Sequence, residues 1–179
     1  MTVETTPLEG LLLIKPALFE DDRGYFFESY SAKKIGHLIK DQFVQDNESL
    51  SHKNVLRGLH FQKPPHAQSK LIRVIRGSIL DVAVDLRPDS PTYKRHYKHV
   101  LSAENKEQLY IPKGFAHGFL SLENESVINY KCSEYYHASS EGSIRWNDPE
   151  LGIDWGVDNP LLAEKDQQAI TLDEFMNPF

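Results

Sequence analysis

The chain is short of cysteine, of basic charge and of long apolar runs, and each shortage removes a class of protein. Its one cysteine, Cys132, allows no intrachain disulfide and no cluster of thiolate metal ligands. Its 26 acidic residues outnumber its 20 basic ones, which argues against a general nucleic-acid binder. No apolar run approaches the roughly 18–20 residues of a membrane span, and the N-terminus has no signal-peptide pattern. We therefore expect a cytoplasmic protein with no nucleic-acid or membrane partner.

The composition that remains is that of a folded protein. The 179 residues are 40% hydrophobic and 11% aromatic, which is enough to bury a substantial core. No internal repeat, low-complexity tract or linker interrupts the sequence. We therefore expect a single domain over residues 1–179.

Short β-like runs separated by turn-forming residues dominate the chain. The clearest is 78–86, where apolar residues such as Val82 alternate with others in a period of two, which predicts a half-buried strand. Residues 71–77 form a second run, and Gly77-Ser78 between the two fits a tight hairpin turn. Similar runs follow at 96–101, 107–112, 118–122 and 126–136.

Helical patterns are few. One short helix is expected over 31–43, with Ser31 as a possible N-cap, and a helical turn over 171–175. Many short strands with few helices favour an all-β sandwich or barrel, and here a jelly roll.

Two segments match the spacing of the cupin superfamily motifs. Gly58, His60 and the six residues between Lys70 and Gly77 match the first motif. Residues 112–117 read P-x-G-x-x-H, which resembles the second. The resemblance implies a cupin jelly-roll β-barrel.

The first motif has lost most of its metal ligands. Metal-binding cupins place His, His and Glu where this chain has His60, Gln62 and Lys70. A lysine repels a divalent ion, and the histidines that remain are too few to hold one, so we expect no metal ligands and no cofactor. The ammonium of Lys70 is instead suited to stabilising an oxyanion, as a metal ion would.

The chain as a whole is similar to the dTDP-4-dehydrorhamnose 3,5-epimerase family. Each matching segment is weak alone, but together they cover nearly the whole chain in order. The segments are FEDDRGYFFESY, VQDNES, KNVLRGLHFQ, KLIRVIRGSILDVAVDLR, LSAENKEQLYIPKGFAHGF, NYKCSEYY, IRWNDPELGIDW and LAEKD.

The resemblance implies conversion of dTDP-4-dehydro-6-deoxy-D-glucose to dTDP-4-dehydro-6-deoxy-L-mannose by inversion at C3 and C5. It makes His60 the base, held by Asp166, because a neutral imidazole accepts a proton near pH 7. It places Lys70 at the C4 oxygen and makes Tyr130 the acid that protonates the opposite face. No hydride cofactor is needed, because both carbons lie next to the C4 ketone.

The resemblance also implies a set of substrate-binding residues. Arg23 and Arg57 match pyrophosphate ligands, because guanidinium groups fit phosphate oxygens. Tyr136 would stack on thymine, and His117 would contact the sugar or organise the base. The full set is Arg23, Glu28, Gln45, Asp46, Asn47, Arg57, His117, Tyr136, Glu141 and Lys165.

Family membership further implies a homodimer. We expect the N-terminal segment 21–28, DDRGYFFE, to cross to the partner, because an exchanged strand also covers an open sheet edge.

Several alternatives remain open at this point. A lone His60 or Tyr130 in a strand is commonly structural, and Lys165 with Asp166 also fits a solvated charge cluster. The same chemistry serves a related epimerase that inverts only C3 or only C5. A non-catalytic sugar-binding cupin needs no base, and a metal-dependent oxygenase needs ligands that this chain lacks.

Overall fold

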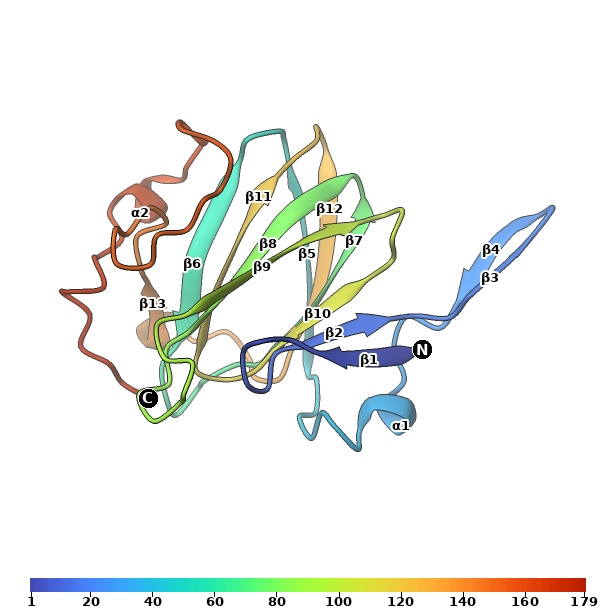
Figure 1. Ribbon diagram of the computed structural model, residues 1–179, viewed down its shortest axis with the longest axis horizontal. Helices are drawn as coiled ribbons and strands as arrows, with labels where there is room; N and C mark the ends of the chain where they lie inside the picture. The colour runs from blue at the N-terminus through green and yellow to red at the C-terminus, as the bar shows by residue number, and fades with distance from the viewer.

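The computed structural model describes residues 1–179 and consists mainly of two antiparallel sheets that pack face to face (Figure 1). The six-stranded sheet contains, in spatial order, β1 (Thr2–Thr5), β2 (Leu12–Lys15), β10 (Gln108–Ile111), β7 (Lys70–Arg76), β12 (Ser126–Cys132) and β5 (Gln45–Ser51). The five-stranded sheet contains β13 (Glu141–Ser143), β6 (Leu56–Gln62), β11 (Phe115–Ser121), β8 (Ser78–Asp85) and β9 (His96–Ser102). The all-β jelly-roll prediction is confirmed.

The remaining elements are short. A separate hairpin pairs β3 (Leu18–Asp21) with β4 (Gly24–Phe27). The helices are α1 (Ala32–Ile35), α2 (Glu164–Gln167) and the 3-10 turn η1 (Ala138–Ser140). The expected helix over 31–43 is therefore a single turn, and Ser31 occupies the N-cap position without making a side-chain cap bond. None of these helices is long enough to span a bilayer.

The predicted hairpin at Gly77-Ser78 is wrong. Strands β7 and β8 are present as expected, but they belong to different sheets. Gly77 has φ of +73°, and a Cβ there would lie 2.6 Å from the Ser126 hydroxyl. This glycine lets the chain turn a tight corner from one sheet to the other.

Strand β8 is buried on both faces, not on one as its alternation suggested. Ile79 and Ala83 pack in the core between the sheets. Val82 and Val84 pack in a second core, beneath the C-terminal segment that follows β13 along the outside of the five-stranded sheet (Figure 1). Asp81 is fully buried on the inner side of this strand. An acidic group is thus placed between the sheets.

Close contact between β6 and β11 sets the position of two histidines. A Cβ on Gly58, whose φ is +129°, would lie 2.5 Å from the Gly118 Cα. Only a glycine permits this approach. The ladder shifts register between His117 and Phe119 and aligns His117 with His60. The two imidazoles therefore come from paired positions on adjacent strands.

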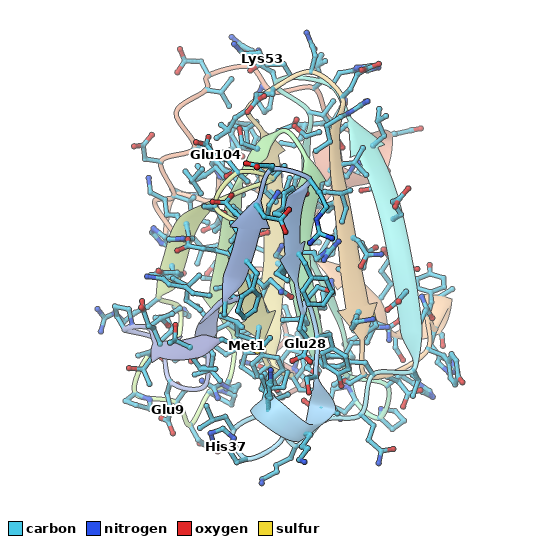
Figure 2. All side chains as sticks on the ribbon, turned by 90° about the vertical axis from the view of Figure 1, so that its right-hand side faces the viewer. Met1, Glu9, Glu28, His37, Lys53 and Glu104 are labelled. Atoms are coloured by element: carbon cyan, nitrogen blue, oxygen red, sulfur yellow. The ribbon has the colours of Figure 1, made fainter.

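The β3–β4 hairpin forms an arm that projects away from the two sheets (Figure 1). Figure 2 looks from the side on which the arm projects, and Glu28 lies just beyond its base. The aromatic side chains of the arm are largely open to solvent, with Phe19 65% and Phe26 69% exposed. An isolated two-stranded hairpin of this kind has little stability of its own.

Candidate active site

Two adjoining cavities of about 200 Å³ each are lined by residues of both sheets. His60, Lys70, Tyr130 and Lys165 line both of them. His60 comes from β6 in the five-stranded sheet, whereas Lys70 and Tyr130 come from β7 and β12 in the facing sheet. The imidazole and the phenol therefore approach the cavity from opposite walls.

His60 is oriented by a buried carboxylate. Its Nε2 lies 2.5 Å from Oδ1 of Asp166, although the two residues are 106 positions apart. Helix α2 carries Asp166, whose side chain is 1% exposed against 22% for His60. Because an ionised carboxylate only accepts hydrogen bonds, the neutral imidazole holds its proton on Nε2 and leaves Nδ1 free to accept another.

Lys70 supplies an ammonium beside the phenol of Tyr130. Its Nζ lies 6.0 Å from the centre of that ring. Burial lowers the pKa of Lys70, while attraction to nearby acidic groups, among them Asp81 and Glu141, opposes this effect. The net shift is downward, so Lys70 loses its proton at a lower pH than an exposed lysine does.

Tyr130 remains a phenol over a wide pH range. Burial is the main cause that raises its pKa above the usual value. It pairs across the sheet with Asn47 of β5, which lines the same cavity. A protonated hydroxyl inside a cavity is suited to donate a proton to a strongly basic carbon.

A second histidine–aspartate pair lies beside the first. His117 Nε2 lies 2.9 Å from Oδ2 of Asp81, and the two side chains are 9% and 0% exposed. Burial lowers the pKa of His117, against the opposing effect of Asp81. The other carboxylate oxygen of Asp81 has no hydrogen-bond partner.

Charged groups also line the cavities closer to solvent. Glu141 accepts hydrogen bonds from Lys165, at 2.7 Å, and from the Tyr136 hydroxyl, at 2.9 Å. Burial raises the pKa of Glu141, but these two bonds together leave it below the usual value. Arg57 donates to the Ser51 hydroxyl at 3.1 Å and to the Leu50 main-chain oxygen at 3.2 Å, which leaves its Nη1 free. No group of three or more His, Cys, Asp or Glu side chains gathers as a metal site.

Comparisons with known proteins give the family. The family model described as dTDP-4-dehydrorhamnose 3,5-epimerase matches residues 5–174. A protein of that name from Escherichia coli is 48% identical, over 98% of this chain and 97% of its own length. The chain belongs to the dTDP-4-dehydrorhamnose 3,5-epimerase family.

Solved structures of epimerases superpose on this one. The Legionella pneumophila epimerase RmlC, in complex with dTDP-4-keto-L-rhamnose, has a TM-score of 0.93 at 46% identity, covering 98% of this chain and 94% of that one. ChmJ, a 3'-monoepimerase from Streptomyces bikiniensis in complex with dTDP-quinovose, has a TM-score of 0.89 at 34% identity, covering 94% and 86%. The family fold thus serves epimerases of different regiochemistry.

Most of the predicted epimerase residues line these cavities. They are His60, Lys70, Tyr130, Asp166, Gln45, Asn47, Arg57, His117, Tyr136, Glu141 and Lys165. Asp46 does not join them. Side chains alternate in direction along β5, and those of Gln45 and Asn47 on either side of it face the cavity. The Asp46 carboxylate pairs instead with Lys131 at 2.9 Å and lines a hollow on the outside of the sheet.

Two further predicted residues lie on or beside the arm, away from the cavities. The side chain of Arg23 is 89% exposed and pairs with Asp21 in the same hairpin. Glu28 pairs with Lys34 of α1 at 2.9 Å. Within one chain, neither reaches His60.

Sequence reasoning missed several residues in or beside these cavities. Asp81 orients His117, and its only signal was an acidic residue in the apolar middle of a strand. Gln68 and Phe119 line the cavities without a distinguishing pattern. Cys132 is buried but also lines a cavity, where its sulphur is 3.6 Å from the Asn47 amide nitrogen.

Proposed function

We propose that the protein inverts C3 and C5 of dTDP-4-dehydro-6-deoxy-D-glucose, giving dTDP-4-dehydro-6-deoxy-L-mannose. The observation that carries the mechanism is the placement of His60 and Tyr130 on facing sheets, with Lys70 beside Tyr130. Inversion at a carbon requires proton removal from one face and delivery to the other. Two facing walls supply this arrangement directly.

His60 removes the proton from the carbon next to the C4 ketone. Its Nδ1 carries the free lone pair, because Nε2 donates to Asp166. As the imidazole becomes an imidazolium, the buried Asp166 carboxylate stabilises the new positive charge. The electron pair left on carbon moves into an enolate, with negative charge on the C4 oxygen.

Lys70 stabilises that enolate oxygen. Its ammonium is fixed at the start of β7 inside the cavity, where water screens its charge poorly. Tyr130 then delivers its proton to the opposite face of the carbon. The same groups serve C3 and C5, because both carbons lie next to the same carbonyl.

His117 acts as a binding group and not as a second base. Because its pKa is lowered by burial, its imidazole is neutral and its Nε2 donates to Asp81. The remaining Nδ1 can accept a hydrogen bond from a sugar hydroxyl.

The nucleotide occupies the more exposed side of the site. Arg57 and Lys165 provide cations for the pyrophosphate, and Tyr136, which is 58% exposed as a residue, offers a ring for the thymine to stack on. Gln45, Asn47 and Glu141 supply polar contacts in the same cavity.

The arm of a second copy completes the site. Exposed aromatic rings and the unoccupied guanidinium nitrogen of Arg23 would gain partners if the arm crossed to another subunit, which would bring Arg23 and Glu28 to its nucleotide.

We expect a dimer by light scattering at micromolar concentration. Mixing inactive His60→Ala and Arg23→Ala chains should restore activity, because one hybrid site then has both residues intact. A monomer, or no recovery after mixing, would contradict arm exchange.

Incubation with the substrate in D2O tests the reaction itself. We expect deuterium at both C3 and C5 and an L-configured product by NMR. Deuterium at C3 alone would identify a monoepimerase, and binding without any exchange would identify a sugar-binding protein.

A further inference from the structure

The loop from Ser133 to His137 carries Tyr136 and is held by side chains that line the cavity. Gln68 donates to the main-chain oxygen of Glu134 at 2.7 Å. Gln45 accepts from the main-chain nitrogen of Tyr136 at 3.2 Å. The two ends of the loop make main-chain bonds to Ser69 and Ser140, and between those ends the backbone is held by side-chain amides.

Gln62 makes the largest number of these contacts. Its Nε2 donates to the main-chain oxygens of His66, at 2.7 Å, and Tyr135, at 3.1 Å. Its Oε1 accepts from the main-chain nitrogen of His137 at 2.7 Å. These bonds hold the backbone on both sides of Tyr136.

The Gln62 amide has little capacity left for a ligand. The residue is 6% exposed, and both of its N–H groups and its oxygen are engaged. A buried amide with this set of partners fixes the backbone groups it binds. Tyr136, in contrast, is 58% exposed as a residue, and its hydroxyl donates to Glu141 at 2.9 Å.

We propose that Gln62 is a positioning residue for nucleotide binding, which holds the Ser133–His137 loop so that Tyr136 presents its ring to the base. It acts through Tyr136 and contacts neither the sugar nor a metal ion. This inference rests on the proposed function. A ring that is already placed loses less freedom when a base stacks on it, so the nucleotide binds more tightly.

Two variants separate this role from a purely structural one. Gln62→Met keeps the length of the side chain and removes all three hydrogen bonds. Gln62→Glu keeps an oxygen for His137 but turns a second oxygen toward the carbonyls of His66 and Tyr135. Those oxygens repel a carboxylate, whereas a protonated carboxyl can donate to one of them. Gln42→Glu is the matched control, since it makes the same charge change at an exposed glutamine that lines neither cavity.

The measurement is dTDP affinity by calorimetry at pH 7.5 and pH 5.5, together with kcat and KM. We expect Gln62→Met to weaken dTDP binding about tenfold, the scale of one base–aromatic stack, and to raise KM far more than it lowers kcat. Gln62→Glu should bind poorly at pH 7.5 and recover at pH 5.5, while the wild type and Gln42→Glu show no such recovery. Adding Gln62→Met to Tyr136→Ala should cost almost nothing further.

The outcomes distinguish a failure of the positioning role of Gln62 from a failure of the proposed function. If the wild type turns over but Gln62→Met lowers kcat at unchanged dTDP affinity, or if the losses from Gln62→Met and Tyr136→Ala add fully, the positioning role is wrong. If Gln62→Glu does not fold, Gln62→Met and the double variant still decide. A wild-type protein that does not bind dTDP would overturn the proposed function as well.

Discussion

The histidines of two histidine–aspartate pairs lie on neighbouring strands of one sheet, and the burial of each pair divides their roles. His60 and His117 occupy paired positions on β6 and β11, and each directs Nε2 to a buried carboxylate. The His60 side chain is 22% exposed, whereas that of His117 is 9% exposed. The same pairing therefore supports proton transfer where the imidazole is open and fixed hydrogen bonding where it is enclosed.

The partner carboxylates differ as well. Asp166 lies on α2, outside the sheets, and reaches in to His60. Asp81 lies on β8 between the sheets, with one oxygen unpaired. Because Asp81 is near Lys70, its charge also favours the lysine ammonium. Asp166 thus acts on the base, and Asp81 acts on His117 and Lys70.

The largest expected effect is that of His60→Ala. Removing the base should lower kcat/KM by roughly 10⁴-fold, the upper end for one acid–base group, and abolish exchange of both carbon-bound protons. Binding of dTDP, measured by calorimetry, should stay within a small factor of the wild type. A variant that lost dTDP affinity as severely as Arg57→Ala would contradict this division of roles.

The next largest effect is expected from a comparison of the same substitution, Asp to Asn, at the two carboxylates, which should lower activity to different extents. Asp166→Asn removes the charge that stabilises the His60 imidazolium, so kcat should fall by about 10²–10⁴-fold. Asp81→Asn leaves a neutral His117 with an oxygen acceptor, and we expect less than about a tenfold change. Steady-state kinetics on both variants, with circular dichroism as a check on folding, make the comparison. Equal losses would show that the two pairs do the same job.

Arg57→Ala should affect binding more than chemistry. Arg57 lies on the same strand as His60 but faces the solvent side of the cavity, where its guanidinium is anchored by Ser51. We expect dTDP binding to weaken by roughly 1.5–3 kcal/mol, the scale of a hydrogen bond to a charged group. Calorimetry with dTDP tests this, and an unchanged affinity would remove Arg57 from the pyrophosphate site.

The smallest expected effect is a pH shift in Asp81→Asn. Activity needs a charged Lys70 and is lost as the pH rises through its pKa, which burial has already lowered. Removing the Asp81 anion lowers that pKa further, so the alkaline limb of kcat/KM should move to lower pH. Loss of the Tyr130 proton does not set the alkaline limb, because the pKa of Tyr130 is raised. A limb that stayed in place or moved upward would contradict the link between Asp81 and Lys70.

Periodicity predicted the strands but not the sheets to which they belong. The runs predicted at 71–77 and 78–86 are both strands, β7 and β8, yet Gly77 directs them to different sheets. A period of two also cannot show whether the second face of a strand is covered. The C-terminal segment covers that face of β8, and the inner face places Asp81 beside His117.

Long-range contacts set the limit of sequence reasoning about the site. The type and spacing of His60 and Lys70 indicated a cupin pocket without a full ligand set, but they did not predict that the Gln62 amide binds main-chain groups. The contact between His60 and Asp166 followed only from family resemblance, because nothing in the 106-residue separation predicts it. Arg23 and Glu28 remain predictions that depend on a second subunit.

The measurement that tests the account most directly is proton exchange by Tyr130→Phe in D2O. This variant keeps His60, Asp166 and Lys70, so it can still form the enolate, but it has no proton to deliver to the other face. The enolate must take a proton back from the His60 imidazolium, which exchanges with solvent. We predict deuterium at the substrate carbons with retained configuration, while net epimerisation falls by roughly 10²–10⁴-fold. Equal losses of exchange and inversion, or no loss of either, would contradict the assignment of base and acid to the two facing sheets.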